Sequence, residues 1–296
     1  MSQQLYQYIA NHMQKHNDAV LQEFSKQIRK ILNQSVTGIV FYGSCMRSRI
    51  YEDGMLDFYV FVENYSNAYS NHGYRIGNYL LPPNVFYLQV ESNKKIYRCK
   101  YAVISQAEMD KAVKAFHSYF WARFCQPIAS IYAKDSSFNH WMAETQCVAA
   151  KSFYRAVMPV LINNKDSQSF WIKGFELTYA AELRAESKQR AELIYRTWQQ
   201  YYDGMFALIM DHKNVTPHYS TFNQLKWKTR IILGKVLSIL RLMKATATFA
   251  GGVDYIAWKI ARHTGQPVAV DNKMRKYPWI FCWPVIYRLF KQGKIR

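Results

Sequence analysis

The sequence predicts an α+β fold, in which a mixed sheet with flanking helices is followed by a mostly helical C-terminal domain. Two observations predict this class. β-type runs are concentrated before residue 106, and beyond it apolar residues recur at helical spacing over long segments. With 296 residues, of which half are apolar, the chain can bury a sizeable core.

The N-terminal part is expected to contain one long helix and four strands. Apolar residues at helical spacing predict an amphipathic helix over residues 4–33. His72 is expected in the loop that follows the predicted strand 56–62. The polar segment 91–95 is expected to be the turn between the last two strands. The four β-type runs cover residues 38–42, 56–62, 85–90 and 96–105.

The C-terminal part is expected to be helical, with breaks or bends at Pro159 and Pro217. We place domain boundaries near residues 136 and 250, so that a helical domain separates the sheet-containing domain from a basic, aromatic tail. The predicted domains are residues 1–136, 137–250 and 251–296. The predicted helices cover residues 106–124, 137–164, 170–212 and 220–249.

The charge of the chain is strongly basic. Lys and Arg number 39 against 20 Asp and Glu, which gives a formal charge of +19, and residues 223–296 contain fifteen basic residues and only two acids. This balance predicts a negatively charged partner: nucleic acid, anionic lipid or a phosphorylated substrate. The five cysteines form no CxxC pair, which argues against a zinc site or a disulfide framework and favours a reducing compartment.

No stretch of 18 apolar residues exists, and the N-terminus has no apolar signal-peptide region. We therefore expect neither a bilayer span nor a cleaved leader.

The most informative segment is FYGSCMRSRIYEDGMLDFYVFVEN, residues 41–64. A predicted strand ends in Gly43-Ser44, and Asp57 lies at the start of the next strand. Because Gly43 has no Cβ, the backbone can approach a phosphate closely, and the Ser44 hydroxyl and backbone N–H groups could hold a triphosphate. Asp57 offers the hard oxygen ligand that Mg²⁺ prefers. The alternative is an ordinary tight turn with a solvated carboxylate.

This pattern resembles the nucleotidyltransferase superfamily, whose signature is a strand, Gly-Ser, and an acidic residue on the neighbouring strand. The resemblance implies a nucleotidyltransferase-type mixed sheet over residues 1–136, with Mg²⁺ as cofactor. Many relatives carry Asp-x-Asp on the second strand, whereas Asp57 is followed here by Phe58 and Tyr59. The second carboxylate must then come from elsewhere, or one metal ion alone is held firmly.

A closer resemblance lies in MLDFYVFVEN, KYAVIS at residues 100–105, and WARFCQPI, which contains Arg123. These segments resemble the mitochondrial-type phosphatidate cytidylyltransferases of the translocator assembly and maintenance family. The resemblance implies CTP and phosphatidic acid as substrates and CDP-diacylglycerol and pyrophosphate as products, with Lys100 and Arg123 at the triphosphate. The family has a basic residue shortly after the arginine, and this chain has Gln126.

The segment LTYAAELRAE, residues 177–186, resembles the Tyr-x-x-Asp-x-Arg element of the same family. Glu182 and Glu186 are four residues apart and share one face of a helix, so Glu182 could supply the missing catalytic and metal-binding carboxylate. The alternative is a charged, solvated face, because Arg184, Lys188 and Arg190 follow.

The tail KMRKYPWIFCWPVIYRLFKQGKIR interleaves basic and aromatic residues, and two prolines exclude one uninterrupted helix. This composition is typical of an interfacial anchor on anionic lipid, and packing on the protein's own core is the alternative. We expect a peripheral protein on the cytoplasmic face of a bacterial inner membrane, or alternatively on the matrix side of the mitochondrial inner membrane.

A nucleic-acid partner is not expected, since no RNA-binding module is recognised. Two other functions stay open: nucleotidyl transfer to RNA, a protein or a small molecule, and a degenerate, non-catalytic membrane scaffold.

Overall fold

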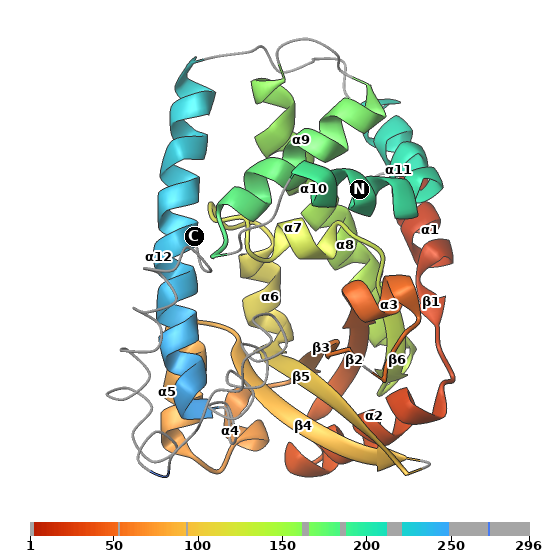
Figure 1. Cartoon of the computed structure of the whole chain (residues 1–296), viewed down its shortest axis with the longest axis vertical. Coiled ribbons are helices and arrows are strands. Elements are labelled where there is room, and N and C mark those ends of the chain that lie inside the picture. The colour runs from red at the N-terminus through yellow and green to blue at the C-terminus, as the bar shows by residue number, and fades with distance from the viewer. Residues whose placement is uncertain are drawn as a thin grey trace.

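The computed structural model describes residues 3–52, 54–92, 94–161, 166–183, 188–211 and 221–248, together with Asn272. Within these ranges the predicted α+β class is confirmed: a mixed sheet is flanked by helices, and a mostly helical part follows (Figure 1). The strands are β1 (Gln14–Lys15), β2 (Val36–Tyr42), β3 (Leu56–Val62), β4 (Asn84–Ser92), β5 (Lys95–Ser105) and β6 (Ala129–Ala133). The short helices of the first half are α3 (Ser44–Ser48), α4 (Tyr65–Ala68), α5 (His72–Leu80), α6 (Gln106–Ala112) and α7 (Trp121–Phe124). The other helices are α1 (Gln3–His12), α2 (Ala19–Ile31), α8 (Ser136–Val157), η1 (Met158–Val160), α9 (Ser167–Ala180), α10 (Lys188–Thr197), α11 (Gln199–Asp211) and α12 (Thr221–Thr248).

The strand order of the sheet is β1-β6-β2-β3-β5-β4. β3 runs antiparallel to β2 and parallel to β5. In this register Asp57 pairs with Tyr42 of β2 on one side and with Lys100 of β5 on the other. The topology therefore places the residues after β2, the start of β3 and the middle of β5 side by side at one edge of the sheet.

The two faces of the sheet belong to two different hydrophobic cores. Successive side chains of a strand point to opposite faces. Val40 and Tyr59 accordingly pack in the core shared with α1, α8, α9 and α11, whereas Phe41 and Phe58 pack in the core shared with α2. The first core joins the sheet to the helical part, and Figure 1 shows that part above the sheet.

The helix predicted over residues 4–33 is wrong as a single element. The chain leaves the helix after His12, and Gln14–Lys15 pairs in parallel with β6. A new helix begins after Asp18, whose carboxylate accepts the backbone N–H groups of Val20 and Leu21. An N-cap of this kind stabilises a helix start, so the apolar periodicity continues across two separate helices.

Two further local predictions are corrected. His72 was expected in a loop, but it is the first residue of α5, which Asn71 caps through its side-chain oxygen. β6 was not predicted, because it is a short strand that lies between helices in the sequence. Its partner β2 is distant in sequence, so the pairing forms only in the folded chain. All four predicted strands match observed ones, β2, β3, β4 and β5, within a few residues.

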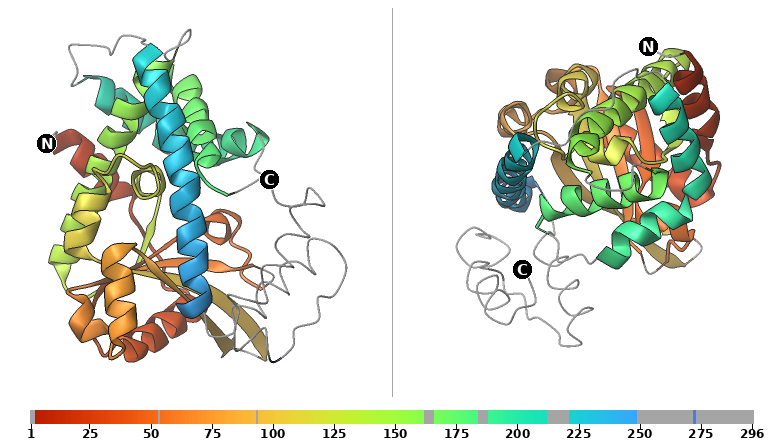
Figure 2. Two further views of the ribbon diagram at one scale, coloured as in Figure 1. Left: turned by 90° about the vertical axis from the view of Figure 1, so that its left-hand side faces the viewer. Right: turned by 90° about the horizontal axis from the view of Figure 1, so that it is seen from above.

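The helical part matches the prediction in type but is more divided. The helix expected over residues 106–124 is two short helices, and the one expected over 170–212 is three. α12 is a single long helix that runs beside both the sheet and the helical part (Figures 1 and 2). The boundaries at residues 136 and 250 stay predictions. The tail 251–296 lies outside the described residues apart from Asn272, and so does Pro217.

In the part of the chain that the structure describes, no helix is both long and apolar enough to cross a bilayer.

Candidate functional site

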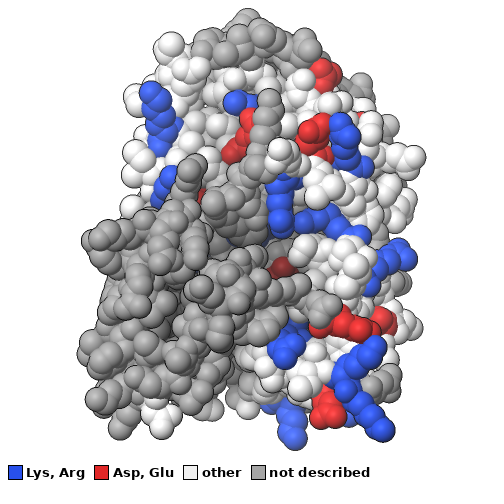
Figure 3. Space-filling model, in the orientation of Figure 1, with Lys and Arg blue, Asp and Glu red and all other residues white. Residues whose placement is uncertain are grey.

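An open cleft lies where the sheet meets the helical part. Its walls come from the ends of β2 and β3, from β4 and β5, and from α3, α7, α9 and α10. On the face shown in Figure 3, Lys and Arg side chains surround a hollow in which an acidic side chain is recessed. All six residues predicted for the site line this cleft: Gly43, Ser44, Asp57, Lys100, Arg123 and Glu182.

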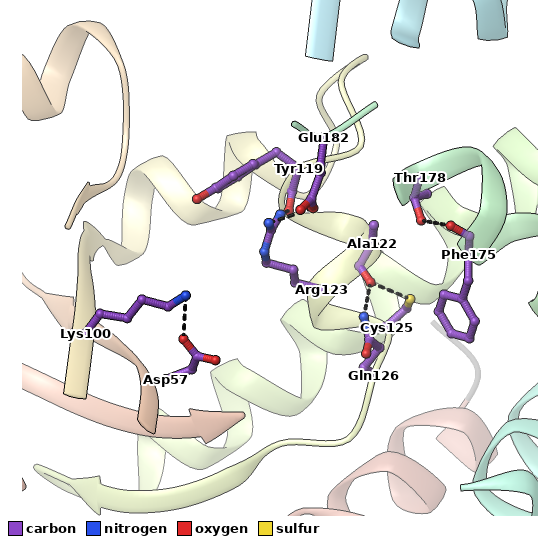
Figure 4. A network of polar contacts seen from close by, with 10 residues as sticks. All are labelled: Asp57, Lys100, Tyr119, Ala122, Arg123, Cys125, Gln126, Phe175, Thr178 and Glu182. Carbon is purple, nitrogen blue, oxygen red and sulfur yellow. Dashed lines mark hydrogen bonds and ion pairs between the residues drawn. The ribbon is translucent and has the colours of Figure 1, made fainter. Parts of the chain in front are cut away.

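Asp57 and Lys100 form an ion pair inside the cleft. Lys100 Nζ lies 2.9 Å from Asp57 Oδ1, and the two side chains are 31% and 15% exposed. Figure 4 shows them pointing toward one another from adjacent strands. Asp57 Oδ1 is itself buried, and the Lys100 ammonium is its ion-pair partner. The Asp57 carboxylate therefore lines the cleft beside a cation.

The turn after β2 is built around Asp57. Gly43 has φ +90° and ψ −160°, a conformation that is essentially restricted to glycine. A Cβ at this position would lie 2.6 Å from Asp57 Oδ2, so only glycine leaves room for the carboxylate. Ser44 follows as the exposed first residue of α3, where no side chain caps the helix. The turn and the carboxylate thus lie against one another.

Arg123 and Glu182 form a second ion pair on the opposite wall. Arg123 Nη2 lies 2.6 Å from Glu182 Oε1, and each side chain is 15% exposed. The guanidinium also lies over the Tyr119 ring, with Cζ 3.9 Å from the centroid, and donates a hydrogen bond to the Tyr119 carbonyl. Burial lowers the pKa of Arg123, but the adjacent Glu182 carboxylate raises it, and the net direction is upward. Arg123 is therefore a permanent cation in a fixed orientation.

The structure adds two cleft residues that the sequence reasoning missed, Arg47 and Arg190. Arg47 comes from α3, directly after the glycine–serine turn, and Arg190 comes from α10. With Lys100 and Arg123 they bring four cationic side chains to a cleft that holds two carboxylates. The sequence left a solvated helix face open as one alternative for Arg190, and the packing of α10 against α9 accompanies its place at the cleft.

Gln126 also lines the cleft and donates its side-chain amide to the Ala122 carbonyl (Figure 4). Gln126 therefore brings no charge to the cleft.

The residues fit a single magnesium ion better than a preformed two-metal centre. No group of three or more His, Cys, Asp or Glu side chains is arranged to hold a metal in the described ranges. Mg²⁺, however, is commonly held by one or two carboxylates plus substrate phosphates and water. Asp57 offers one such carboxylate in the lining of the cleft. Glu182 pairs with Arg123 instead, so its assignment as a metal ligand stays a prediction.

Comparisons with known proteins yield little. No protein-family model matches the sequence, and no curated protein matches it. One similar solved structure is a nucleotidyltransferase-like protein from Exiguobacterium sibiricum 255-15, with 10% sequence identity, 93% coverage of each chain and a TM-score of 0.28.

Proposed function

We propose that the chain is a magnesium-dependent nucleotidyltransferase, with the cleft as its nucleotide site. The observation that carries the proposal is the direct contact between Asp57 and the Gly43-Ser44 turn, at a place where Gly43 alone leaves room for the carboxylate. A turn that only reversed the chain would not require a carboxylate packed against its glycine. The cationic excess of the cleft supports an anionic substrate such as a nucleoside triphosphate.

The proposed roles follow from the placement of the side chains. Lys100 and Arg47 flank the turn and supply positive charge to the triphosphate, while the Ser44 hydroxyl donates a hydrogen bond to it. Asp57 would hold Mg²⁺, which supplies a charge that offsets the developing negative charge on the leaving phosphates. Lys100 pairs with Asp57, and it could contact the phosphates where Asp57 held the ion.

Arg123 is proposed to hold a phosphate from the opposite wall. Its stacking on Tyr119 and its pairing with Glu182 fix the guanidinium before any ligand arrives, which lowers the entropic cost of binding. Glu182 is the proposed second carboxylate of the site. Glu182 orients Arg123, and as a metal ligand it would have to exchange that partner.

The finer proposal is transfer of a cytidylyl group from CTP to phosphatidic acid, and it is supported by the sequence resemblance. An oxygen of the acceptor phosphate attacks the α-phosphorus of CTP, a new P–O bond forms, and the bond to the β-phosphate oxygen breaks to release pyrophosphate. The acceptor oxygen is already anionic, so no strong general base is needed. Positioning and charge stabilisation are expected to provide most of the rate enhancement.

The test is product formation from labelled CTP, Mg²⁺ and phosphatidic acid vesicles. Wild type is expected to form CDP-diacylglycerol and Asp57→Asn is expected to form none. Glu52→Gln is the matched control, because Glu52 pairs with Lys95 in an exposed ion pair at 2.7 Å outside the cleft. Equal activity of wild type and Asp57→Asn would refute the proposed site.

The same assay separates the alternatives. If product forms with RNA, a protein or a small molecule as acceptor and not with the lipid, the proposed lipid acceptor is wrong. The proposed nucleotidyltransferase activity is then retained. No nucleotide binding at all would favour a non-catalytic scaffold.

A further inference from the structure

α12 presents an apolar surface that is exposed in the part of the chain that the structure describes. Large apolar side chains recur at helical spacing along one side of this helix and are 41–64% exposed. We name them the α12 stripe: Leu225, Ile232, Val236 and Ile239. A row of large apolar side chains on one helix face is normally turned toward a core.

The inner face of α12 is fixed, so the stripe cannot turn inward without breaking specific contacts. Trp227 is buried and donates its indole N–H to the Ala156 carbonyl at 2.7 Å. Arg230 donates to the Phe116 carbonyl at 2.6 Å, and Arg241 donates to the Pro82 carbonyl at 2.9 Å. Lys244 donates to three carbonyls at the end of α5, including that of Pro83 at 3.0 Å.

With 3.6 residues per turn, the stripe lies roughly opposite these inward-facing residues. Figure 2 agrees, since α12 lies at the outside of the described part of the molecule.

The charged side chains of α12 are all basic. α12 contains six Lys and Arg and no acidic residue. The exposed Lys228 and Lys235 are seven residues apart, so they lie on one flank of the stripe. Basic residues beside an exposed apolar stripe are typical of helices that lie in the headgroup layer of an anionic membrane.

α5 lies beside α12 and also carries exposed apolar side chains. It is held against the C-terminal half of α12 by the Lys244 hydrogen bonds, and Figure 1 shows the two helices side by side. Its Ile76, Tyr79 and Leu80 are exposed.

We infer that the α12 stripe and its flanking lysines form the surface by which the protein docks on an anionic lipid membrane. Two other occupants are disfavoured by charge. Residues 249–296 contain nine Lys and Arg against two acids, and a second copy of the chain would present the same lysines, so both would bring positive charge to a positive flank. An anionic lipid surface complements the lysines and buries the apolar side chains together. The inference holds whether or not the cleft transfers nucleotides.

The test is co-sedimentation of the full chain, without nucleotide, with vesicles of phosphatidylcholine and phosphatidylglycerol. Wild type is expected to bind, with binding weakened by salt and by omission of phosphatidylglycerol. Ile232→Glu is expected to weaken binding about tenfold or more, since it removes buried apolar area and adds repulsion. Lys228→Glu with Lys235→Glu is expected to reduce the salt dependence.

The matched control is Ile31→Glu, which changes an isoleucine of similar exposure, 50%, on α2. It is expected to bind vesicles as wild type does. Vesicle binding by Ile232→Glu equal to that of wild type, or no binding by wild type, would overturn the inference. A lower melting temperature of Ile232→Glu with unchanged vesicle binding would instead indicate that the chain covers the stripe itself, and a concentration-dependent dimer lost in Ile232→Glu would indicate a second copy. Both outcomes also reject lipid as the occupant.

Discussion

Replacing Gly43 by alanine tests whether the turn positions the carboxylate. The backbone conformation at Gly43 costs a non-glycine residue about 1–3 kcal/mol. The new Cβ would lie 2.6 Å from Asp57 Oδ2, whereas ordinary contact begins near 3.4 Å, so the carboxylate must retreat by close to 0.8 Å. A displacement of about 1 Å of a catalytic group can cost about 10²-fold in rate.

Two assays on the Gly43→Ala protein separate stability from function. Urea unfolding is expected to show a loss of about 1–3 kcal/mol, and CTP turnover at a temperature where the protein stays folded is expected to fall about 10²-fold. Gly77→Ala is the control, because a Cβ there meets its nearest neighbour at 3.5 Å in an ordinary helix. If Gly43→Ala loses stability but keeps turnover within about twofold, the claim that this turn positions Asp57 is refuted.

Three further predictions concern residues around the cleft and in the core. Arg241 also stacks on the Tyr119 ring, with Cζ 3.9 Å from the centroid that Arg123 contacts, so Arg241→Met is expected to weaken CTP binding several-fold in calorimetric titration. Tyr119→Leu is expected to do the same, whereas Tyr119→Phe keeps the ring and is expected to bind as wild type does. Burial lowers the pKa of His117 from 6.5 to about 4 in the folded protein. As the pH falls, His117 is therefore protonated in the unfolded chain before it is protonated in the folded protein. Stability is therefore full above pH 6.5 and falls between pH 6.5 and about 4 by at most about 3 kcal/mol, and His117→Asn is expected to flatten urea-unfolding data in that range. Gly38→Ala places a Cβ 2.1 Å from the Phe138 ring and is expected to lower stability by about 1–3 kcal/mol in the same assay.

Each of these predictions has an outcome that contradicts it. Weakened CTP binding by Tyr119→Phe would show that the hydroxyl, not the ring, matters. An unchanged pH profile in His117→Asn would assign the acid sensitivity to other groups. Wild-type stability of Gly38→Ala would show that the Phe138 ring can move aside at little cost.

Local patterns were enough to predict the sheet residues of the site. β3 has the predicted bounds, because its β-type run is continuous and buried on both faces. Gly43, Ser44 and Asp57 could be found because only the short helix α3 and one loop separate the turn from β3. Lys100 was found through the family resemblance, and the parallel register of β3 and β5 explains its place beside Asp57.

Contacts between distant segments could not be predicted. Arg190 reaches the cleft through packing of α10, and the pairing of Arg123 with Glu182 joins residues 59 positions apart in sequence. The break after His12 depends on pairing of β1 with β6, a strand that the sequence did not reveal. Such features depend on tertiary packing between segments, and the periodicity of a single segment does not predict them.

The central claim is that Asp57 holds Mg²⁺ at a nucleotide site, and calorimetric titration of CTP with and without Mg²⁺ tests it most directly. In wild type, Mg²⁺ is expected to tighten CTP binding, and in Asp57→Asn that gain is expected to disappear while the charge-dependent binding to Lys100 and Arg123 persists. An equal gain from Mg²⁺ in both proteins, or no binding of CTP to wild type, would contradict the account.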